Sequence, residues 1–156
     1  MIRMIAACSS NGVIGLNNSI PFHYPEDLKH FKQSTQNSVV IMGRKTFESL
    51  NNKCLPNRRN IIITSQNIDS LETYSSLQEA IKSIDVLGDI WLIGGAKIYE
   101  EGMKLAEEII LTITTDYINE DGVVKFPWIN PLKFKVTETK KLGSHGLIIV
   151  TYQKLH

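Results

Sequence analysis

The feature that most constrains the fold is the alternation of short apolar runs with amphipathic windows along the whole chain. Runs rich in Val, Ile and Leu, such as Ile2–Cys8 and Val39–Met42, have the length of buried strands. Windows with helical periodicity lie between these runs. Strands that alternate with helices typically form a sheet that is covered on both faces. The sequence therefore predicts the α/β class.

Turn and capping residues place the expected elements. Proline suits the first turn of a helix, so a helix should begin near Pro25 and run to about Ser34. Ser76 and Glu79 have the spacing of a capping box for a helix over Leu77–Asp85. The other expected elements are strands over Asn60–Thr64, near Thr73–Tyr74, Asp89–Ile93, Glu108–Thr115, Lys133–Lys141 and Leu147–Leu155, and helices over Arg44–Leu50 and up to Leu105.

The expected architecture is a mixed, mostly parallel central sheet of about eight strands with helices on both faces. The last two strands flank the turn Gly143–Gly146 and should form an antiparallel C-terminal hairpin. Residues Ser9–Pro25 are predicted to form a long loop, and loops of this length often serve as functional lids. No linker composition divides the sequence, so we expect one domain over residues 1–156.

Composition excludes several classes of function. The 42% hydrophobic and 21% charged content is that of a globular protein, and a net charge of +1 gives no reason to expect nucleic-acid or membrane partners. The first residues lack a signal-peptide pattern, and no apolar run approaches the ~20 residues of a membrane span. Cys8 and Cys54 lack metal-ligand spacing and are expected to be free thiols. We expect a cytoplasmic protein without a metal site.

Asp27 is the strongest candidate for a catalytic acid. On a helix it shares a face with Phe31, and Leu28 borders that face. Loss of solvation beside apolar surface would raise its pKa from ~3.9 towards neutrality and suit it to bind an amidine-like edge and promote protonation. The competing interpretation is an acidic residue that is stabilised by the helix dipole. Glu26 points about 100° away and is expected to face water.

Three turns that follow apolar strands could hold a phosphate group. In Met42–Thr46 a helix begins with Arg44 and Lys45, cations that oppose the helix dipole unless an anion binds. In Leu92–Tyr99 two glycines let the backbone approach a pyrophosphate, although the Gly-x-Gly-x-x-Gly fingerprint is absent and tight packing explains the pair equally well. The third turn is Thr64–Gln66, whose hydroxyl groups also suit an ordinary polar turn.

Few other residues offer catalytic chemistry. Arg58 or Arg59 could bind a substrate carboxylate, although a solvent-facing pair is the more common situation. The sequence contains no Ser nucleophile elbow, Walker loop, paired catalytic acids or metal cluster. One acid, phosphate turns and apolar walls favour proton-assisted hydride transfer over hydrolysis. The four histidines are scattered, which suggests structural or exposed positions: His23, His30, His145 and His156.

In their order and spacing, several motifs resemble the dihydrofolate reductase family, and the resemblance runs from Ile2 to near the C-terminus. The motifs are Ile5-Ala6-Ala7, Gly12-Val13-Ile14-Gly15, Pro21-Phe22-x-x-Pro25-x-Asp27, Met42–Ser49, Leu55–Asn60, Ile93-Gly94-Gly95 with Tyr99, and Phe126-Pro127. The chain departs from the bacterial family where Phe22 replaces the usual Trp, and near Asn51–Cys54 and Asp121–Gly122, where each turn has an apparent extra residue.

The resemblance implies reduction of 7,8-dihydrofolate to 5,6,7,8-tetrahydrofolate by NADPH, with hydride transfer to C6 and Asp27-assisted protonation at N5. It also implies a monomer that binds antifolates, a cis peptide at Gly94–Gly95 and a lid over Gly12–Tyr24. The implied substrate-binding residues are Ile5, Ala7, Leu28, Phe31, Leu50, Leu55, Arg58, Ile93 and Thr112. The implied NADPH-binding residues are Ala7, Ile14, Gly15, Gly43, Arg44, Lys45, Thr46, Thr64, Ser65, Gly94, Gly95, Ala96, Lys97, Ile98 and Tyr99.

Within that resemblance, particular groups have particular roles. Arg58 would pair with the glutamate carboxylate of folate, and Arg44, Thr64 and Ser65 would bind the 2′-phosphate that distinguishes NADPH from NADH. Two other functions remain open: a reductase of the same fold that acts on a riboflavin-pathway pyrimidine, and a folate- or nucleotide-binding module without catalysis. Oxidation of NADPH that depends on dihydrofolate would distinguish dihydrofolate reduction from both of these alternatives.

Overall fold

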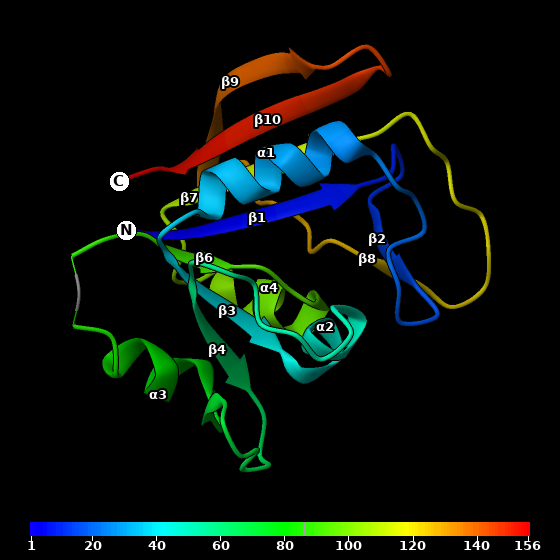
Figure 1. Ribbon diagram of the computed structural model, residues 1–156. Coiled ribbons are helices and arrows are strands. Elements are labelled where there is room, and N and C mark those ends of the chain that lie inside the picture. The colour runs from blue at the N-terminus through cyan, green and yellow to red at the C-terminus, as the bar shows by residue number, and fades with distance from the viewer. Residues whose placement is uncertain (86) are drawn as a thin grey trace.

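The computed structural model describes residues 1–85 and 87–156 and is built around one eight-stranded sheet (Figure 1). Its strand order is β5-β4-β3-β6-β1-β7-β10-β9. The strands of this sheet are β1 (Ile2–Cys8), β3 (Val39–Gly43), β4 (Arg59–Ile63), β5 (Glu72–Tyr74), β6 (Ile90–Leu92), β7 (Glu108–Ile113), β9 (Phe134–Leu142) and β10 (Leu147–Lys154). The helices are α1 (Pro25–Thr35), α2 (Arg44–Ser49), α3 (Leu77–Lys82) and α4 (Ala96–Gly102).

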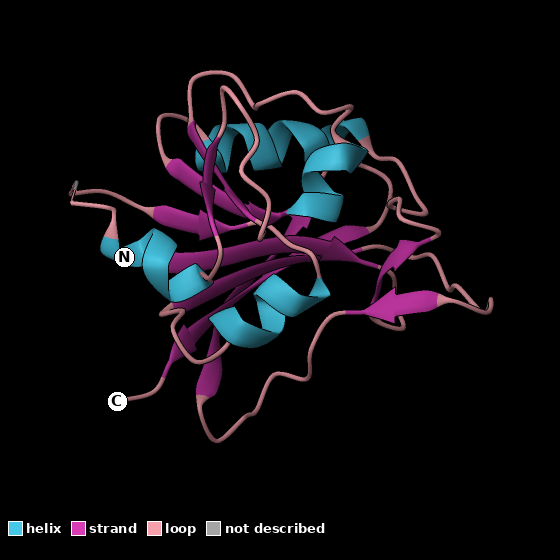
Figure 2. Ribbon diagram, turned by 90° about the horizontal axis from the view of Figure 1, so that it is seen from below, coloured by secondary structure: helices cyan, strands magenta, loops and turns pink. Residues whose placement is uncertain are grey.

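The strand directions confirm the predicted mixed sheet. Every neighbouring pair from β5 through β7 is parallel, whereas β10 pairs antiparallel with both β7 and β9. Helices cover both faces of the sheet, as Figure 2 shows. None of the helices over the described residues has the length and apolar character that crossing a membrane requires.

Each face of the sheet has its own apolar core, because successive strand residues point to opposite faces. The first core, on the side of α3 and α4, contains Met4, Val39, Ile41, Ile61, Leu77, Ala80, Leu92, Ile98, Tyr99, Ala106, Ile109 and Phe134. The second core, on the side of α2, contains Ile5, Val40, Met42, Phe47, Ile62 and Trp91. The partly buried Ile110 packs against the second core and meets α1, so α1 lies on this same side.

The predicted loop Ser9–Pro25 contains structure that the sequence did not indicate. Val13–Leu16 forms strand β2, which pairs antiparallel with β8 (Val123–Lys125) in a separate two-stranded sheet. Both strands are short, and neither shows the alternation of a half-buried strand, so the pairing depends on a distant partner. Part of the expected lid is therefore an ordered strand, which pairs with the segment just before Phe126.

Two helices are shorter than predicted. The helix expected over Leu77–Asp85 ends at Lys82, where the N–H group of Ser83 still bonds back to the last turn. Ser76 caps its start by accepting a hydrogen bond from the Glu79 N–H group at 3.2 Å, as the spacing predicted. The helix expected up to Leu105 ends at Gly102, a residue type that favours helix ends.

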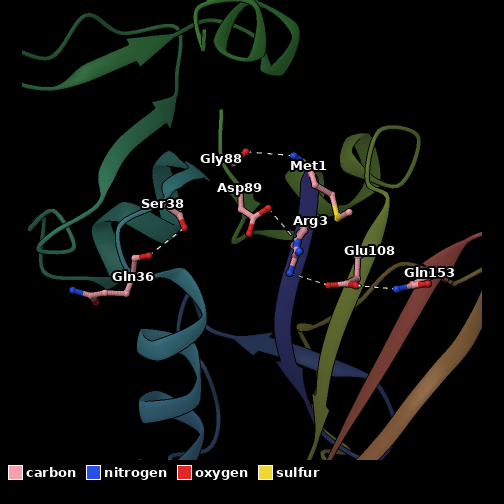
Figure 3. Close-up of polar contacts among 8 residues, drawn as sticks. All are labelled: Met1, Arg3, Gln36, Ser38, Gly88, Asp89, Glu108 and Gln153. Carbon is pink, nitrogen blue, oxygen red and sulfur yellow. Dashed lines mark hydrogen bonds and ion pairs between the residues drawn. The ribbon is translucent and has the colours of Figure 1, made fainter. Parts of the chain in front are cut away.

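A polar network ties together the amino ends of the central strands (Figure 3). Arg3 on β1 lies between Asp89, at 3.4 Å, and Glu108 on β7, at 3.2 Å. Its guanidinium carbon lies 5.4 Å from the ring centroid of Trp91, and Glu108 also accepts a bond from Gln153. Ligands of open parallel sheets bind outside the carboxyl ends of the strands. This network therefore stabilises the amino ends of the strands, opposite the end where a ligand is expected.

Candidate active site

The carboxyl ends of three adjacent strands bring the predicted phosphate turns together. β3 ends at Gly43, β6 is followed by Gly94, and β4 is followed by Thr64. The strands are neighbours in the order β4-β3-β6, so these ends lie side by side. The Gly43 N–H group donates to the Gly94 carbonyl oxygen at 2.8 Å. The turns at Gly43, Gly94 and Thr64 therefore lie next to one another at the carboxyl ends of the strands.

The backbone conformation and the surrounding space both favour glycine at Gly94. The peptide bond between these residues is cis, as the family resemblance implied, and Gly94 has a φ of 114°. A Cβ atom on Gly94 would lie 3.2 Å from the Tyr99 ring, whereas a Cβ on Gly95 would meet only the Thr46 hydroxyl at 3.7 Å. The absence of a side chain at Gly95 leaves backbone that a ligand can approach closely.

The α4 side chains have different surroundings. Ile98 and Tyr99 are buried in the first core, and the Tyr99 hydroxyl donates to the Ile5 carbonyl oxygen at 2.8 Å. Their side chains are thus committed to packing, and any contact with a ligand would come from their backbone. Ala96 and Lys97 form the first turn of α4, and Lys97 is exposed.

The predicted cations lie in the exposed first turn of α2. Arg44 pairs with Glu48 at 3.1 Å, and both side chains are about half exposed, 47% and 50%. Lys45 is exposed and Thr46 is partly buried. An exposed pair of this kind contributes little to stability, so Arg44 can exchange Glu48 for an anionic ligand at low cost.

The remaining predicted cofactor residues belong to two other segments. Ser65 is exposed, and the Thr64 hydroxyl accepts a bond from the Gln66 N–H group at 3.2 Å. Ile14 and Gly15 lie on β2, and Ile14 packs against the first core. The short strand β2 thus places part of the expected lid against the main body of the fold.

Asp27 lies in the first turn of α1 beside Thr112 of β7. Burial raises the pKa of the Asp27 carboxyl above its usual value, in the direction that the sequence predicted. The Thr112 hydroxyl and a nearby charge on His30 lower that pKa in part, and Glu26 raises it further. Thr112 is 1% exposed, and its hydroxyl has no hydrogen-bond partner of standard geometry among the described residues. A partly buried carboxyl that can still ionise is suited to hold a cationic or amidine group.

Predicted apolar wall residues gather on the second-core side. Leu50, Leu55 and Ile93 all pack against the second core, to which Ile5 belongs. Ala7 is the register partner of Thr112 on the neighbouring strand, which places it next to the Asp27 region. On α1, Phe31 is partly buried and Leu28 is 53% exposed, so the Leu28 side chain is accessible to a ligand.

The two adjacent arginines have separate partners. Arg59 forms a bidentate pair with Glu72, with distances of 2.8 and 2.6 Å, so it is not available to a substrate. Arg58 turns the other way: its Nε donates to the Pro56 carbonyl oxygen at 2.9 Å and its Nη1 to the Thr35 hydroxyl at 3.0 Å. Among the described residues its Nη2 has no such bond, and this group could bind a carboxylate.

Two contacts around the start of α1 were not predicted from the sequence. The Tyr24 hydroxyl donates to Asp116 at 2.6 Å, and this bond lowers the pKa of Asp116. Glu26 was expected to face water, but its carboxylate lies 2.5 Å from Nδ1 of His145 and its side chain is only 18% exposed. The partners are 92 and 119 residues apart, and no periodic pattern signals contacts at such separations.

Within residues 1–85 and 87–156, no group of three or more His, Cys, Asp or Glu side chains is arranged to hold a metal ion. Cys8 is buried and Cys54 is exposed, and both are free thiols.

Comparison with known proteins agrees with this geometry. A sequence model of the family described as dihydrofolate reductase matches residues 1–154. The chain is 41% identical to dihydrofolate reductase of Neisseria meningitidis over 150 residues, 93% of this chain and 91% of the relative. It is 48% identical to the enzyme of Buchnera aphidicola over 113 residues, 71% of this chain and 70% of the relative.

A solved structure has the same fold over the full length of the chain. It is dihydrofolate reductase from Enterococcus faecalis complexed with NADP(H) and RAB-propyl, with a TM-score of 0.88 and 24% sequence identity, covering 100% of this chain and 97% of that one. The family match and the identities over most of the chain decide the assignment. The chain therefore belongs to the dihydrofolate reductase family of oxidoreductases.

Proposed function

We propose that the chain reduces 7,8-dihydrofolate to 5,6,7,8-tetrahydrofolate with NADPH, and that Asp27 is the catalytic acid. The observation that carries the role of Asp27 is its partly buried carboxyl beside the buried Thr112, on the side of the sheet that carries the second core. The amidine edge of a pterin matches a carboxylate there, with two parallel N–H···O bonds. Ile5, Ile93 and Phe31 would hold the ring by apolar contact.

The glutamate portion of the substrate fits Arg58. Burial lowers the pKa of this guanidinium, which stays charged at any working pH. Thr35 and Pro56 fix two of its nitrogens and leave Nη2 for the carboxylate. Leu28, Leu50 and Leu55 would line the path between this arginine and Asp27.

The carboxyl edge of β4, β3 and β6 fits a dinucleotide. Gly95 offers open backbone for a pyrophosphate, with Lys45, Thr46 and the turn up to Tyr99 around it. Arg44, Thr64 and Ser65 would bind the 2′-phosphate and so favour NADPH over NADH. When bound, NADPH supplies the hydride that is transferred to C6 of the pterin.

Asp27 would promote the accompanying protonation at N5. Its carboxylate holds the amidine edge, and the added negative charge stabilises the positive charge that protonation creates on the ring. The balance is one hydride to C6 and one proton to N5, which converts the C6=N5 bond to a single bond. The apolar walls and the lid over Gly12–Tyr24 would exclude water from the reacting atoms.

Absorbance of NADPH in the presence of dihydrofolate tests the proposal, with NADH and a no-folate sample as controls. Asp27→Asn should lower kcat/KM about 10²–10⁴-fold at neutral pH and recover in part as pH falls, because protonated substrate needs less help. Asp85→Asn, an exposed change remote from the site, should leave the rate unchanged. Equal rates for wild type and Asp27→Asn would refute the role of Asp27, and NADPH binding without oxidation would favour a binding module.

The raised pKa of Asp27 argues against loss of folding as the cause of the expected loss of rate in Asp27→Asn. Because the folded-state pKa of Asp27 is raised, its ionisation costs stability above that pKa and costs none once pH falls below the unfolded value of 3.8. Asparagine does not ionise, so the variant should gain stability relative to wild type as pH rises from acid towards neutrality. Thermal unfolding at both pH values measures this difference.

A further inference from the structure

His30 lies one helical turn after Asp27 on α1. Its side chain lines a cavity of about 300 Å³ between α1 and strands β7, β9 and β10. The Nε2 atom is buried and has no hydrogen-bond partner among the described residues. A polar atom in this situation is costly, so its presence calls for a physical reason.

Asp27 and His30 lie over two neighbouring rows of side chains on the sheet, which begin at Thr112 and at Ile110 of β7. Ile110 and Thr112 on β7 point to the same face, two residues apart. Asp27 lies beside Thr112, and His30 shares its cavity with Ile110. Three helix residues rise about 4.5 Å and two strand residues about 6.6 Å, so over this turn the helix positions and the strand positions become displaced by about 2 Å. The row of Ile110 continues through Thr151 and Glu138, and that of Thr112 through Ile149 and Lys140.

Three charged groups act on His30 or share its cavity within the described chain. Asp27 comes from α1, and Glu138 and Lys140 come from β9, whereas β7 and β10 contribute uncharged side chains to the cavity. Burial lowers the pKa of His30, Asp27 raises it, and Lys140 lowers it further. In return, the His30 cation lowers the pKa of Asp27 against the effect of burial. Each group therefore shifts the pKa of the other.

We propose that His30 is a positioning residue for Asp27: as an imidazolium, it stabilises the Asp27 carboxylate across the helical turn they share and preserves the amidine-binding anion at acidic pH. The inference rests on the role proposed above for Asp27. Its effect is confined to pH values below the pKa of His30, because the neutral imidazole at higher pH gives the carboxylate no charge partner.

The direct test measures the pKa of Asp27 in the ligand-free protein, from its carboxyl ¹³C chemical shift, with Asp27→Asn to assign the signal. His30→Gln keeps a polar side chain but removes the cation and should raise the pKa of Asp27 by about half a unit. His30→Lys restores a cation and should return the pKa to the wild-type value or below it. His156→Gln, an exposed histidine change, should have no effect. An unchanged Asp27 pKa in His30→Gln would overturn the proposal.

A binding experiment separates this proposal from the proposed function. The probe is a 2,4-diaminopyrimidine antifolate, whose protonated amidine edge requires an ionised Asp27. At about pH 5, His30→Gln should bind it about threefold more weakly than wild type, and the difference should close by about pH 8. If Asp27→Asn binds with the wild-type pH dependence, the role of Asp27 is wrong. If Asp27→Asn alters that dependence and His30→Gln does not, only the role of His30 is overturned.

Discussion

Replacing Thr112 with valine should stabilise the protein while impairing the site. Thr112 is 1% exposed, and its hydroxyl is buried without a hydrogen bond of standard geometry among the described residues. Thr114 is the matched control: it is 2% exposed on the same side of the same chain segment, but its hydroxyl bonds Asp116 twice, at 2.8 and 3.2 Å. The two residues differ in whether the buried hydroxyl is satisfied.

The magnitudes follow from that difference. A valine methyl group fills the space of the hydroxyl, so below pH 3.8, where Asp27 is protonated, Thr112→Val removes a desolvation cost of about 1 kcal/mol and should raise the free energy of unfolding by about that amount. At neutral pH the gain should be smaller, because the same hydroxyl also stabilises the Asp27 carboxylate. Thr114→Val loses one bond to a charged acceptor and one to a backbone N–H group, which together are worth about 2–4 kcal/mol. For a chain of this size, 1 kcal/mol corresponds to a shift of about 2–4 °C in Tm.

Thermal and urea unfolding of the two variants would measure the contrast. We expect a higher Tm for Thr112→Val and a clearly lower one for Thr114→Val. The carboxyl ¹³C titration should also show the Asp27 pKa rising in Thr112→Val, since a group that lowers that pKa is gone. If Thr112→Val instead loses 1 kcal/mol or more, the Thr112 hydroxyl makes a bond that the structure does not show, and the reasoning fails.

Two further changes test how the core supports the site. Tyr99→Phe leaves the Ile5 carbonyl without its donor at 2.8 Å and should lower the free energy of unfolding, measured in urea, by about 1–3 kcal/mol. The exposed Tyr117→Phe is the control and should cause no measurable loss. Equal losses in the two variants would contradict the role of the Tyr99 hydrogen bond. Gly102→Ala places a Cβ 2.4 Å from Leu92 Cδ1 and 2.9 Å from Met4 Sδ. The cost of overpacking, about 1–3 kcal/mol, should outweigh a helix-propensity gain of at most about 1 kcal/mol and lower the Tm. A raised Tm would contradict this expectation and show that the neighbouring side chains move to make room.

The sequence predicted the parts of the fold that local patterns determine. The apolar runs gave the central strands within one or two residues, and Pro25 and Ser76 marked the starts of α1 and α3. Strand β2 escaped prediction because its four residues have a burial pattern without alternation and pair with a strand more than a hundred residues away. Pairings of that separation depend on the packed fold and leave no local signature.

In the candidate site, too, local patterns indicated some features, and contacts between distant residues determine the others. Asp27, the glycine turns and Arg44 were candidates from residue type and helix or strand position alone, and their roles stay predictions. Residue type alone left Arg58 and Arg59 as alternatives, and only the family resemblance favoured Arg58, because the difference between them lies in their distant partners Thr35 and Glu72. The environment of Glu26 was predicted wrongly for the same reason, since His145 reaches it from the β9–β10 turn. Gly143 makes this approach possible, because a Cβ there would lie 2.8 Å from the Glu26 carboxylate.

The register of β7 decides which groups reach Asp27. Six residue pairs join β7 to β1, and six join it to β10, so β7 is held on both sides. A slip of one residue would turn Thr112 to the opposite face and bring Leu111 or Ile113 beneath the carboxyl. The antiparallel hairpin of β9 and β10 thus does more than cover a sheet edge. By fixing β7, it keeps Thr112 beneath Asp27 and Ile110 beside His30, so the charge state of the acid depends on strand pairing at a distance along the chain.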